Sequence, residues 1–375
     1  MIITLFLLKF TWKGKKQIGE MLKQSGPIEN VRYSEEGDYT VLHVGEYRKK
    51  TGEDPSKEQI RQIHEEIGEQ RGLLKKLRET EMTYGRRLKE AIGEGRHQVM
   101  NTINQLMSPW EAYQQRRRIK AFRKDPKKDA KDIAWIVTGR AQNKYGGGRA
   151  MRKAEESEGR VTFYVGPGKA YQQGPEAAGK EILKNMVDIY KKTGVKPESF
   201  RYRTDIIRPH SSGVNAVVHK LKEIREKTGV KYVLGMAGDP YGSHPDDKPR
   251  IGTYAIGKMI DLEHESTSSP KGRKTIIKLY GKREKYTDNP IRYDAAAGLG
   301  DELVKIEDAY DPQANKFYVI HGGKEHQLHT GHFAQASDLE TNLLLSKIAS
   351  KGLEEVKKEL KQEHKYRERE YKKAA

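Results

Sequence analysis

Cysteine is missing altogether from the 375 residues of this chain. That absence excludes disulfide bonds, thiolate zinc sites and a cysteine nucleophile. Long apolar runs are missing too, because the opening run Ile2–Leu8 is too short to span a bilayer and no basic residue precedes it as in a signal peptide. We expect a buried strand there, an intracellular or virion-borne protein with no recognisable secretory signal, and no membrane partner.

Negative charge is scarce. The chain has 72 Lys and Arg against 53 Asp and Glu, which leaves a formal charge of +19, and only 35% of its residues are hydrophobic. The Lys/Glu-rich surface of a thermophilic protein balances its signs, whereas this excess repels itself unless phosphates or acidic surfaces supply counter-charge. The composition therefore favours a polyanionic partner, with nucleic acid first among the options.

The pattern of elements predicts a mixed α/β (α+β) protein. We expect a small β-containing unit at 1–50, a helical and strongly basic segment at 51–158, an α/β domain at 159–336, and a long helix with a charged tail at 337–375. Five stretches favour strands beyond the opening run: Tyr39–Val44, Val161–Val165, Tyr254–Leu262, Thr275–Tyr280 and Phe317–Ile320.

Glycine and proline mark the helices of the α/β domain. Pro175 opens a helix that should end at Gly194, and a second helix should end at Gly229. Each is followed by Val-Lys, so two helix–glycine–strand units of one design are expected in a small parallel or mixed sheet. Ser337 and Glu340 have the spacing of a capping box for the last helix.

The densest charge lies at 116–131, where only two aspartates oppose the cations and Pro126 ends any helix. Such a run is either a solvated connector or a contact for phosphate backbones. The nucleic-acid-binding residues predicted from it are Arg116, Arg117, Arg118, Lys120, Arg123, Lys124, Lys127, Lys128 and Lys131.

Four histidines crowd one later segment, namely His321, His326, His329 and His332. They could supply imidazoles to zinc or manganese and so support a metal-dependent phosphodiesterase, or they could be exposed histidines of a basic loop. We assign neither a metal nor another cofactor. The segment 166–169, Gly-Pro-Gly-Lys, lacks the hydroxyl residue of a phosphate-binding P-loop, and no Ser-His-Asp frame is recognisable.

One stretch resembles a known family. The segments that carry the resemblance are, in order, Ser108-Pro109-Trp110, the basic run, 136–140 (Ile-Val-Thr-Gly-Arg), and 161–167 followed by Tyr171. With these segments, residues of about 95–175 resemble the tail-completion and morphogenesis proteins of tailed phages. The resemblance implies a structural protein at the head–tail junction.

The sequence accordingly favours a structural, DNA-associated virion protein, a neck, connector or capsid-associated component, over an enzyme. We expect it to form a homo-oligomer, to contact other structural proteins, and to bind nucleic acid through the phosphate backbone. The metal-dependent phosphodiesterase and a cellular RNA-binding protein are the alternatives. With 20 tyrosines against 7 phenylalanines, the aromatic content also favours a binding or assembly protein.

Overall fold

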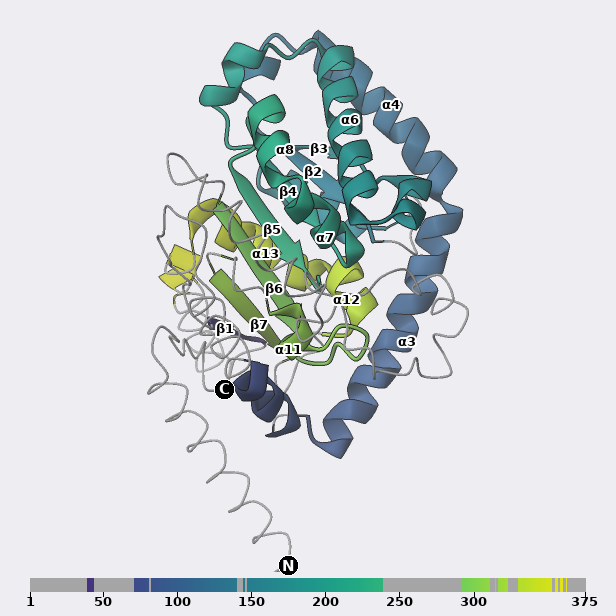
Figure 1. The fold of residues 1–375 in the computed structure, drawn as a ribbon, viewed down its shortest axis with the longest axis vertical. Coiled ribbons are helices and arrows are strands. Elements are labelled where there is room, and N and C mark those ends of the chain that lie inside the picture. Colours follow the sequence, from purple (N-terminus) through teal and green to yellow (C-terminus); the bar gives the residue numbers. More distant parts are fainter. Residues whose placement is uncertain are drawn as a thin grey trace, which may run out of the picture.

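A seven-stranded sheet runs through the centre of the protein in a computed structural model of the chain (Figure 1). The structure describes residues 39–43, 71–80, 82–139, 144–145, 147–238, 292–310, 314, 316–322 and 330–352, and scattered positions up to 362. The strands are β1 (Tyr39–His43), β2 (Ile133–Val137), β3 (Val161–Tyr164), β4 (Ile206–Pro209), β5 (Tyr232–Met236), β6 (Arg292–Gly298) and β7 (Lys316–Gly322).

Six of these strands are parallel. The order is β1-β7-β6-β5-β4-β2-β3, and only the edge strand β1 runs antiparallel, against β7. The strands β2 and β5 are buried at every residue, as expected for parallel strands that are covered on both faces. The chain runs outward from β2 to β3 and then returns to place β4 on the other side of β2. Between β2 and β4 the strand order therefore reverses, and ligands in open α/β sheets bind at the carboxyl ends of strands beside such a reversal.

Helices cover both faces of the sheet. They are α3 (Tyr84–Leu106), α4 (Ser108–Lys124), α5 (Arg149–Ser157), α6 (Pro175–Thr193), α7 (Ser212–His219), α8 (Leu221–Thr228), α11 (Ile306–Ala309), α12 (His332–Ser337) and α13 (Leu339–Lys351), with a further helix at 71–80. Short 3-10 helices lie at Lys128–Ala130 (η1), Gly168–Gln173 (η2) and Pro197–Arg201 (η3). None of the described helices is long and apolar enough to cross a membrane.

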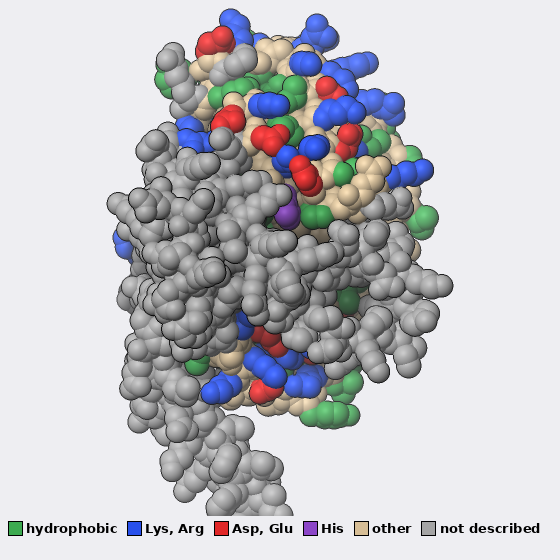
Figure 2. Space-filling model, in the orientation of Figure 1, with side chains coloured by type: hydrophobic (Ala, Val, Ile, Leu, Met, Phe, Trp, Pro, Cys, Tyr) green, Lys and Arg blue, Asp and Glu red, His purple; other side chains and the backbone are tan. Residues whose placement is uncertain are grey.

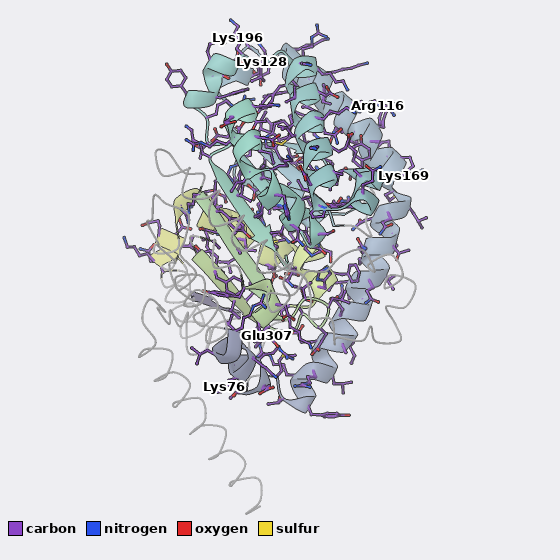
Figure 3. The ribbon with its side chains drawn as sticks, in the orientation of Figure 1. Lys76, Arg116, Lys128, Lys169, Lys196 and Glu307 are labelled. Atoms are coloured by element: carbon purple, nitrogen blue, oxygen red, sulfur yellow. The ribbon has the colours of Figure 1, made fainter. Side chains whose placement is uncertain are left out.

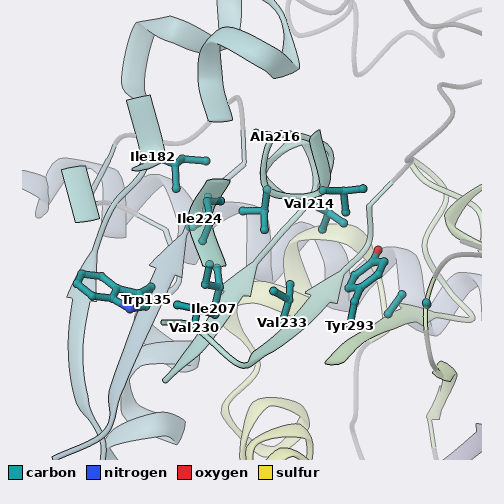
Figure 4. Close-up of a cluster of buried hydrophobic side chains, with 14 of the residues drawn as sticks. Trp135, Ile182, Ile207, Val214, Ala216, Ile224, Val230, Val233 and Tyr293 are labelled. Carbon is teal, nitrogen blue, oxygen red and sulfur yellow. The ribbon is translucent and has the colours of Figure 1, made fainter. Parts of the chain in front are cut away.

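Two hydrophobic cores lie on opposite faces of the sheet. On one face Trp135, Ile207 and Val233 pack under Ile182 of α6 and Val214 of α7 (Figure 4 shows this layer). The other core lies beneath α5, α12 and α13 and consists of Ala134, Ile136, Met151, Tyr164, Ile206, Tyr232, Leu234, Met236, Ala296, Tyr318, Ile320, Ala336, Leu344, Leu345, Ile348 and Val356. The result is a three-layer α/β fold with its loops gathered at the two ends of the strands.

The mixed α/β prediction is confirmed, as are the strands expected near 39–44, 161–165 and 317–320. The helix opened by Pro175 ends at Gly194 in the left-handed region, with φ 69°. The expected strands at Ile2–Leu8, Tyr254–Leu262 and Thr275–Tyr280 lie outside the described residues. The proposed domain boundaries stay a prediction, although β1 belongs to the same sheet as the later strands.

Two local predictions are wrong. The helix expected to reach Gly229 without interruption is broken at Lys220, which separates α7 from α8. The expected capping box is replaced by Asp338, whose carboxylate accepts the Thr341 N–H at 2.8 Å. The Ser337 hydroxyl instead donates to the Phe333 carbonyl at 2.7 Å, because Ser337 closes the preceding helix α12.

Candidate active site

A sharp turn joins the central strand β4 to helix α7, and Ser211 forms it. Ser211 has φ 54° and ψ −134°, a conformation that costs a non-glycine residue about 1–3 kcal/mol. Two backbone hydrogen bonds hold the turn, from the His210 N–H to the Val137 carbonyl at 3.0 Å and from the Ser211 N–H to the Met236 carbonyl at 2.8 Å. A strained serine between a parallel strand and a helix is the geometry of a nucleophile elbow, which lifts the hydroxyl above the sheet.

Glycines allow neighbouring backbone to approach this turn closely. A Cβ at Gly139, after β2, would lie 2.9 Å from the Ser211 Cβ. A Cβ at Gly213 would lie 3.0 Å from Val137 Cγ1 and 3.1 Å from the Tyr171 hydroxyl. Larger residues at either position would push the loop after β2 away from the serine. The backbone at Gly139 therefore lies directly beside the Ser211 side chain.

The same two loops are tied together by Tyr171. Its buried hydroxyl donates to the Thr138 carbonyl, and the Ser212 hydroxyl is hydrogen-bonded to the same phenol oxygen. Burial raises the pKa of Tyr171, so the phenol stays protonated and remains a donor. This contact holds the first residue of α7 against the loop after β2. In such an elbow, the N–H of the residue after the nucleophile and an N–H of that loop bind the developing oxyanion.

A carboxylate–imidazole pair lies at the ends of β6 and β7. His332 Nδ1 lies 2.9 Å from Asp301 Oδ2, and both side chains are buried. The other carboxylate oxygen of Asp301 accepts the N–H groups of Leu303 at 2.9 Å and Val304 at 2.8 Å. Asp301 therefore has a fixed orientation, and its acceptor oxygen selects the His332 tautomer with the proton on Nδ1. The lone pair is then on Nε2, the nitrogen that a general base would use.

The charge of Asp301 governs the ionisation of His332. Burial by itself would lower the pKa of the imidazole, but the attraction and hydrogen bond of Asp301, helped by the Glu94 carboxylate, outweigh it and raise the pKa above its usual range. An imidazolium at this position is consequently stabilised. That property is required of a base that holds a proton during the reaction.

His210 connects the serine turn to the His332 loop. Its Nε2 donates to the His332 carbonyl at 2.9 Å, and the two imidazole rings are 4.8 Å apart. Burial, then the proximity of His332, lowers the pKa of His210 to about 3. His210 is therefore neutral at ordinary pH and acts as a hydrogen-bond donor. Because it immediately precedes Ser211, this bond brings the serine turn beside the His332 loop.

Two glutamates of α3 support the His332 loop from behind. Glu90 accepts the Thr330 N–H at 2.9 Å. Glu94 accepts the N–H of Phe333 at 2.8 Å and that of Ala334 at 3.3 Å. Both backbone donors directly follow His332. Helix α3 thus fixes the position of His332 although it contributes no side chain to the pair with Asp301.

The structure places the predicted nucleic-acid-binding residues on an outer helix and the turn after it. Six of the nine lie on α4, the other three lie on or beside η1, and Figure 3 shows Arg116 and Lys128 at the outer surface. One of them, Arg118, is partly buried with its guanidinium over the Tyr164 ring at 6.0 Å. None belongs to the cluster around Ser211.

The predicted histidine cluster is divided. His321 lies in β7, whereas His326 and His329 lie outside the described residues. His332 pairs with Asp301, and the described part of the chain contains no group of three or more His, Asp or Glu side chains suited to a metal ion.

Sequence reasoning missed Ser211 and Asp301. Residues 209–213 read Pro-His-Ser-Ser-Gly, which has the serine and second glycine of G-x-S-x-G but a proline in place of the first glycine. The order Ser, Asp, His along the chain, each after a strand, is the remaining signal, since α/β-hydrolases carry their triads in this order.

Comparison with known proteins returned only structural likenesses. No family model matches the chain, and no curated protein matches its sequence. Aspergillus fumigatus lipase B is similar at 13% identity and TM-score 0.41, over 60% of this chain and 53% of that one, so the chain spans about half the length of that lipase. An extracellular α/β-hydrolase from a Paenibacillus species is similar at 12% identity and TM-score 0.36, over 59% of this chain and 98% of the other.

A metagenomic carboxyl esterase, MGS0156, is similar at 16% identity and TM-score 0.35, over 59% of this chain and 75% of the other.

The resemblance to tailed-phage morphogenesis proteins is wrong. The three solved structures named above are a lipase, an α/β-hydrolase and a carboxyl esterase, and the stretch at 95–175 supplies part of α3, the whole of α4 and two strands of the parallel sheet. The prediction of a structural, DNA-associated virion protein is wrong for the same reason, and so is its RNA-binding alternative. The phosphodiesterase alternative relied on the histidine segment, of which His332 pairs with Asp301. Net charge is a property of the surface and does not report the chemistry of a buried site.

Proposed function

We propose that the protein is a serine hydrolase that cleaves carboxylic esters, with Ser211 as nucleophile, His332 as general base and Asp301 as the residue that orients the histidine. The observation that carries the proposal is the strained Ser211 turn beside a buried Asp301–His332 pair. Ser211 follows β4, Asp301 follows β6 and His332 comes after β7, so all three lie at the carboxyl-end edge of the parallel sheet, the edge where α/β sheets bind their ligands.

The chemistry follows from the roles of these groups. The Ser211 Oγ attacks the ester carbonyl carbon while His332 Nε2 takes its proton, and Asp301 stabilises the resulting imidazolium. The carbonyl oxygen becomes an oxyanion. The Ser212 N–H and a backbone N–H of the loop after β2, at Gly139, donate hydrogen bonds to it. When the carbon–oxygen bond to the alcohol breaks, His332 returns the proton to the leaving alkoxide. Water then attacks the acyl-serine by the same route and releases the acid.

An organophosphonate probe tests the nucleophile without knowledge of the natural ester. We expect one probe molecule per chain on the peptide that contains Ser211, together with hydrolysis of short-chain p-nitrophenyl esters. Ser211→Ala should abolish both signals, and His332→Gln should slow labelling by orders of magnitude because the serine loses its base. The measurements are peptide mass spectrometry and initial rates.

A serine elsewhere provides the control. Ser157 ends α5 and donates to the Ala154 carbonyl at 2.7 Å, so Ser157→Ala should label and hydrolyse like the parent protein. The proposal fails if Ser211→Ala retains ester hydrolysis, or if the probe reacts at another residue with Ser211 intact.

A further inference from the structure

Helix α3 presents its polar face to the protein. Glu90 and Glu94 bond to the His332 loop, and His97 Nδ1 lies 2.7 Å from the Ser337 hydroxyl. Asn101, one turn further on, is buried as well. These residues recur at a spacing of three and four, so they form one helical face. An amphipathic surface helix ordinarily turns its apolar face inward, and α3 does the opposite.

The apolar face of α3 points outward and continues into α4. We call it the α3–α4 apolar stripe; its six residues are Leu88, Ile92, Val99, Ile103, Leu106 and Trp110. Leu106 is 76% exposed, Ile92 68% and Trp110 51%. Figure 1 shows the two helices following one another along one edge of the molecule, and in Figure 2 hydrophobic side chains stand out near the start of α3. A contiguous apolar surface of this kind marks a contact site.

Charge is excluded from the middle of this stripe and concentrated at its ends. Between His97 and Gln115 the only Lys, Arg, Asp or Glu is Glu111, which is buried 3.8 Å from Arg152. Beyond that interval exposed cations resume on α4, and the Arg117 guanidinium lies over the exposed Tyr113 ring at 6.0 Å. Lys120 and Lys124 follow at helical spacing on the same side.

We propose that the α3–α4 apolar stripe docks on an anionic lipid surface. Apolar side chains would enter the interface between headgroups and acyl chains, Trp110 and Tyr113 would lie at headgroup level, and Arg117, Lys120 and Lys124 would contact lipid phosphates. The two helices follow the outer edge of the molecule (Figure 1), and a lipid surface accepts an outward apolar face without a matching groove. The contact is superficial, since no described helix could span the bilayer.

Charge complementarity selects this occupant over a second copy of the chain. Two copies would bring together surfaces that each carry the cationic end of α4, on chains with a formal charge of +19. Anionic lipid supplies the opposite charge. The opening run Ile2–Leu8, on which the expected absence of a membrane partner depends, is separate from this helical face.

Vesicle flotation of the full chain tests the proposal. We expect binding to phosphatidylcholine vesicles that contain phosphatidylglycerol, weaker binding to pure phosphatidylcholine, and a loss of binding as salt rises. The double variant Ile92→Gln with Leu106→Gln keeps helix propensity and should weaken binding about tenfold or more, because the two side chains together lose apolar burial worth more than about 1.4 kcal/mol. Arg117→Gln with Lys120→Gln should reduce only the preference for anionic vesicles.

Three controls separate this proposal from folding and from catalysis. Tyr202 is 74% exposed on the loop after η3, away from the stripe, so Tyr202→Gln should bind vesicles like the parent chain. Ser211→Ala should also bind normally, because docking does not depend on the hydrolase proposal. In a Trp12→Phe background, Trp110→Phe should bind but lose most of the blue shift in tryptophan fluorescence on vesicle addition, since the one tryptophan that remains, Trp135, is already buried.

Three results would overturn the proposal. The parent chain could fail to float with anionic vesicles, or the stripe double variant could float as well as the parent. The third is a dimer in light scattering that the stripe double variant dissociates, which would assign the stripe to a second copy of the chain.

Discussion

At the residue scale, the site depends on an unfavourable backbone conformation at Ser211 and on two histidines of opposite character. His210 and His332 lie 4.8 Å apart, yet burial lowers the pKa of the first to about 3 while Asp301 raises that of the second. The two imidazoles therefore never compete for one proton near neutral pH. His210 acts as a fixed donor, and His332 is the titrating base.

The acid limb of the pH–rate profile should report His332. The imidazole must be unprotonated to accept the serine proton, and its pKa is raised above 6.5. The kcat/KM for an ester should therefore rise with pH through a midpoint above 6.5. Asp301→Asn removes the charge that raises this pKa, so the midpoint should move down and the rate should fall by about 10³–10⁴-fold.

Glu302 is the matched control for that measurement, because it adjoins Asp301 but is exposed. Glu302→Gln should leave the midpoint unchanged. If the Asp301→Asn variant keeps the pH–rate profile of the parent protein, Asp301 does not orient His332.

At the element scale, three elements outside the chemistry hold the reacting groups in place. Arg208 of β4 is fully buried beneath the serine turn and pairs with Glu155 of α5, and it bonds Asn342 of α13 at 3.0 Å and Ser346 at 2.7 Å. Removing one partner of such a buried network leaves an uncompensated charge. On the far side, α3 holds the loop of His332 through Glu90 and Glu94.

Glu94→Ala should lower kcat about tenfold with little change in KM. The substitution leaves the two backbone N–H groups after His332 without their carboxylate acceptor, which costs about 1–3 kcal/mol for each unmet donor. His332 is then held less firmly, whereas the residues that contact the substrate are unchanged. The substitution also removes a charge that raises the pKa of His332, so the acid limb should shift to lower pH. Steady-state kinetics across pH measure both effects.

Glu94→Gln, which keeps one acceptor oxygen, should restore part of kcat. Glu79→Ala, at an exposed position of the helix at 71–80, should change nothing. An unchanged kcat in Glu94→Ala would show that α3 does not position His332.

At the scale of the whole molecule, the two ends of the sheet carry different kinds of side chains. The carboxyl ends carry Ser211, Asp301 and His332, whereas the amino ends carry buried ion pairs. There Asp205 accepts the Ile133 N–H at 2.7 Å and the Tyr190 hydroxyl at 2.7 Å, and Arg203 pairs with it at 3.0 Å. Asp205 precedes β4 and Ser211 follows it, so the whole strand lies between them, a separation of roughly 20 Å for six extended residues.

Stability and catalysis should therefore separate in Asp205→Asn. Burial raises the pKa of Asp205 to about 6, so below that pH the folded protein binds a proton that the unfolded chain gives up near the ordinary aspartate pKa of 3.8. This contribution is fully present at low pH and is lost as pH rises through about 6, a change of roughly 2–3 kcal/mol. Asp205→Asn should remove that slope from the urea unfolding free energy while kcat at neutral pH stays unchanged.

A slope that persists in Asp205→Asn would assign the titration to another group. A large loss of kcat would show that the two ends of the sheet are coupled.

The sequence by itself determined the local structure of this protein. Gly194 and Gly229 end helices because only glycine readily adopts their left-handed conformation, Pro175 begins one, and short apolar runs form the strands. The mixed α/β class followed from those local signals. They depend on neighbours a few residues apart, so they can be read from the chain directly.

Only the tertiary structure decided where the site lies. His332 is 31 residues from Asp301 and 122 from His210, and parallel pairing of β4, β5, β6 and β7 brings them together. The strain at Ser211 and the inward polar face of α3 likewise exist only once the sheet has formed. Strand order is set by long-range packing, for which a short sequence window carries no signal, and so the basic surface stood out in the sequence while the catalytic pair did not.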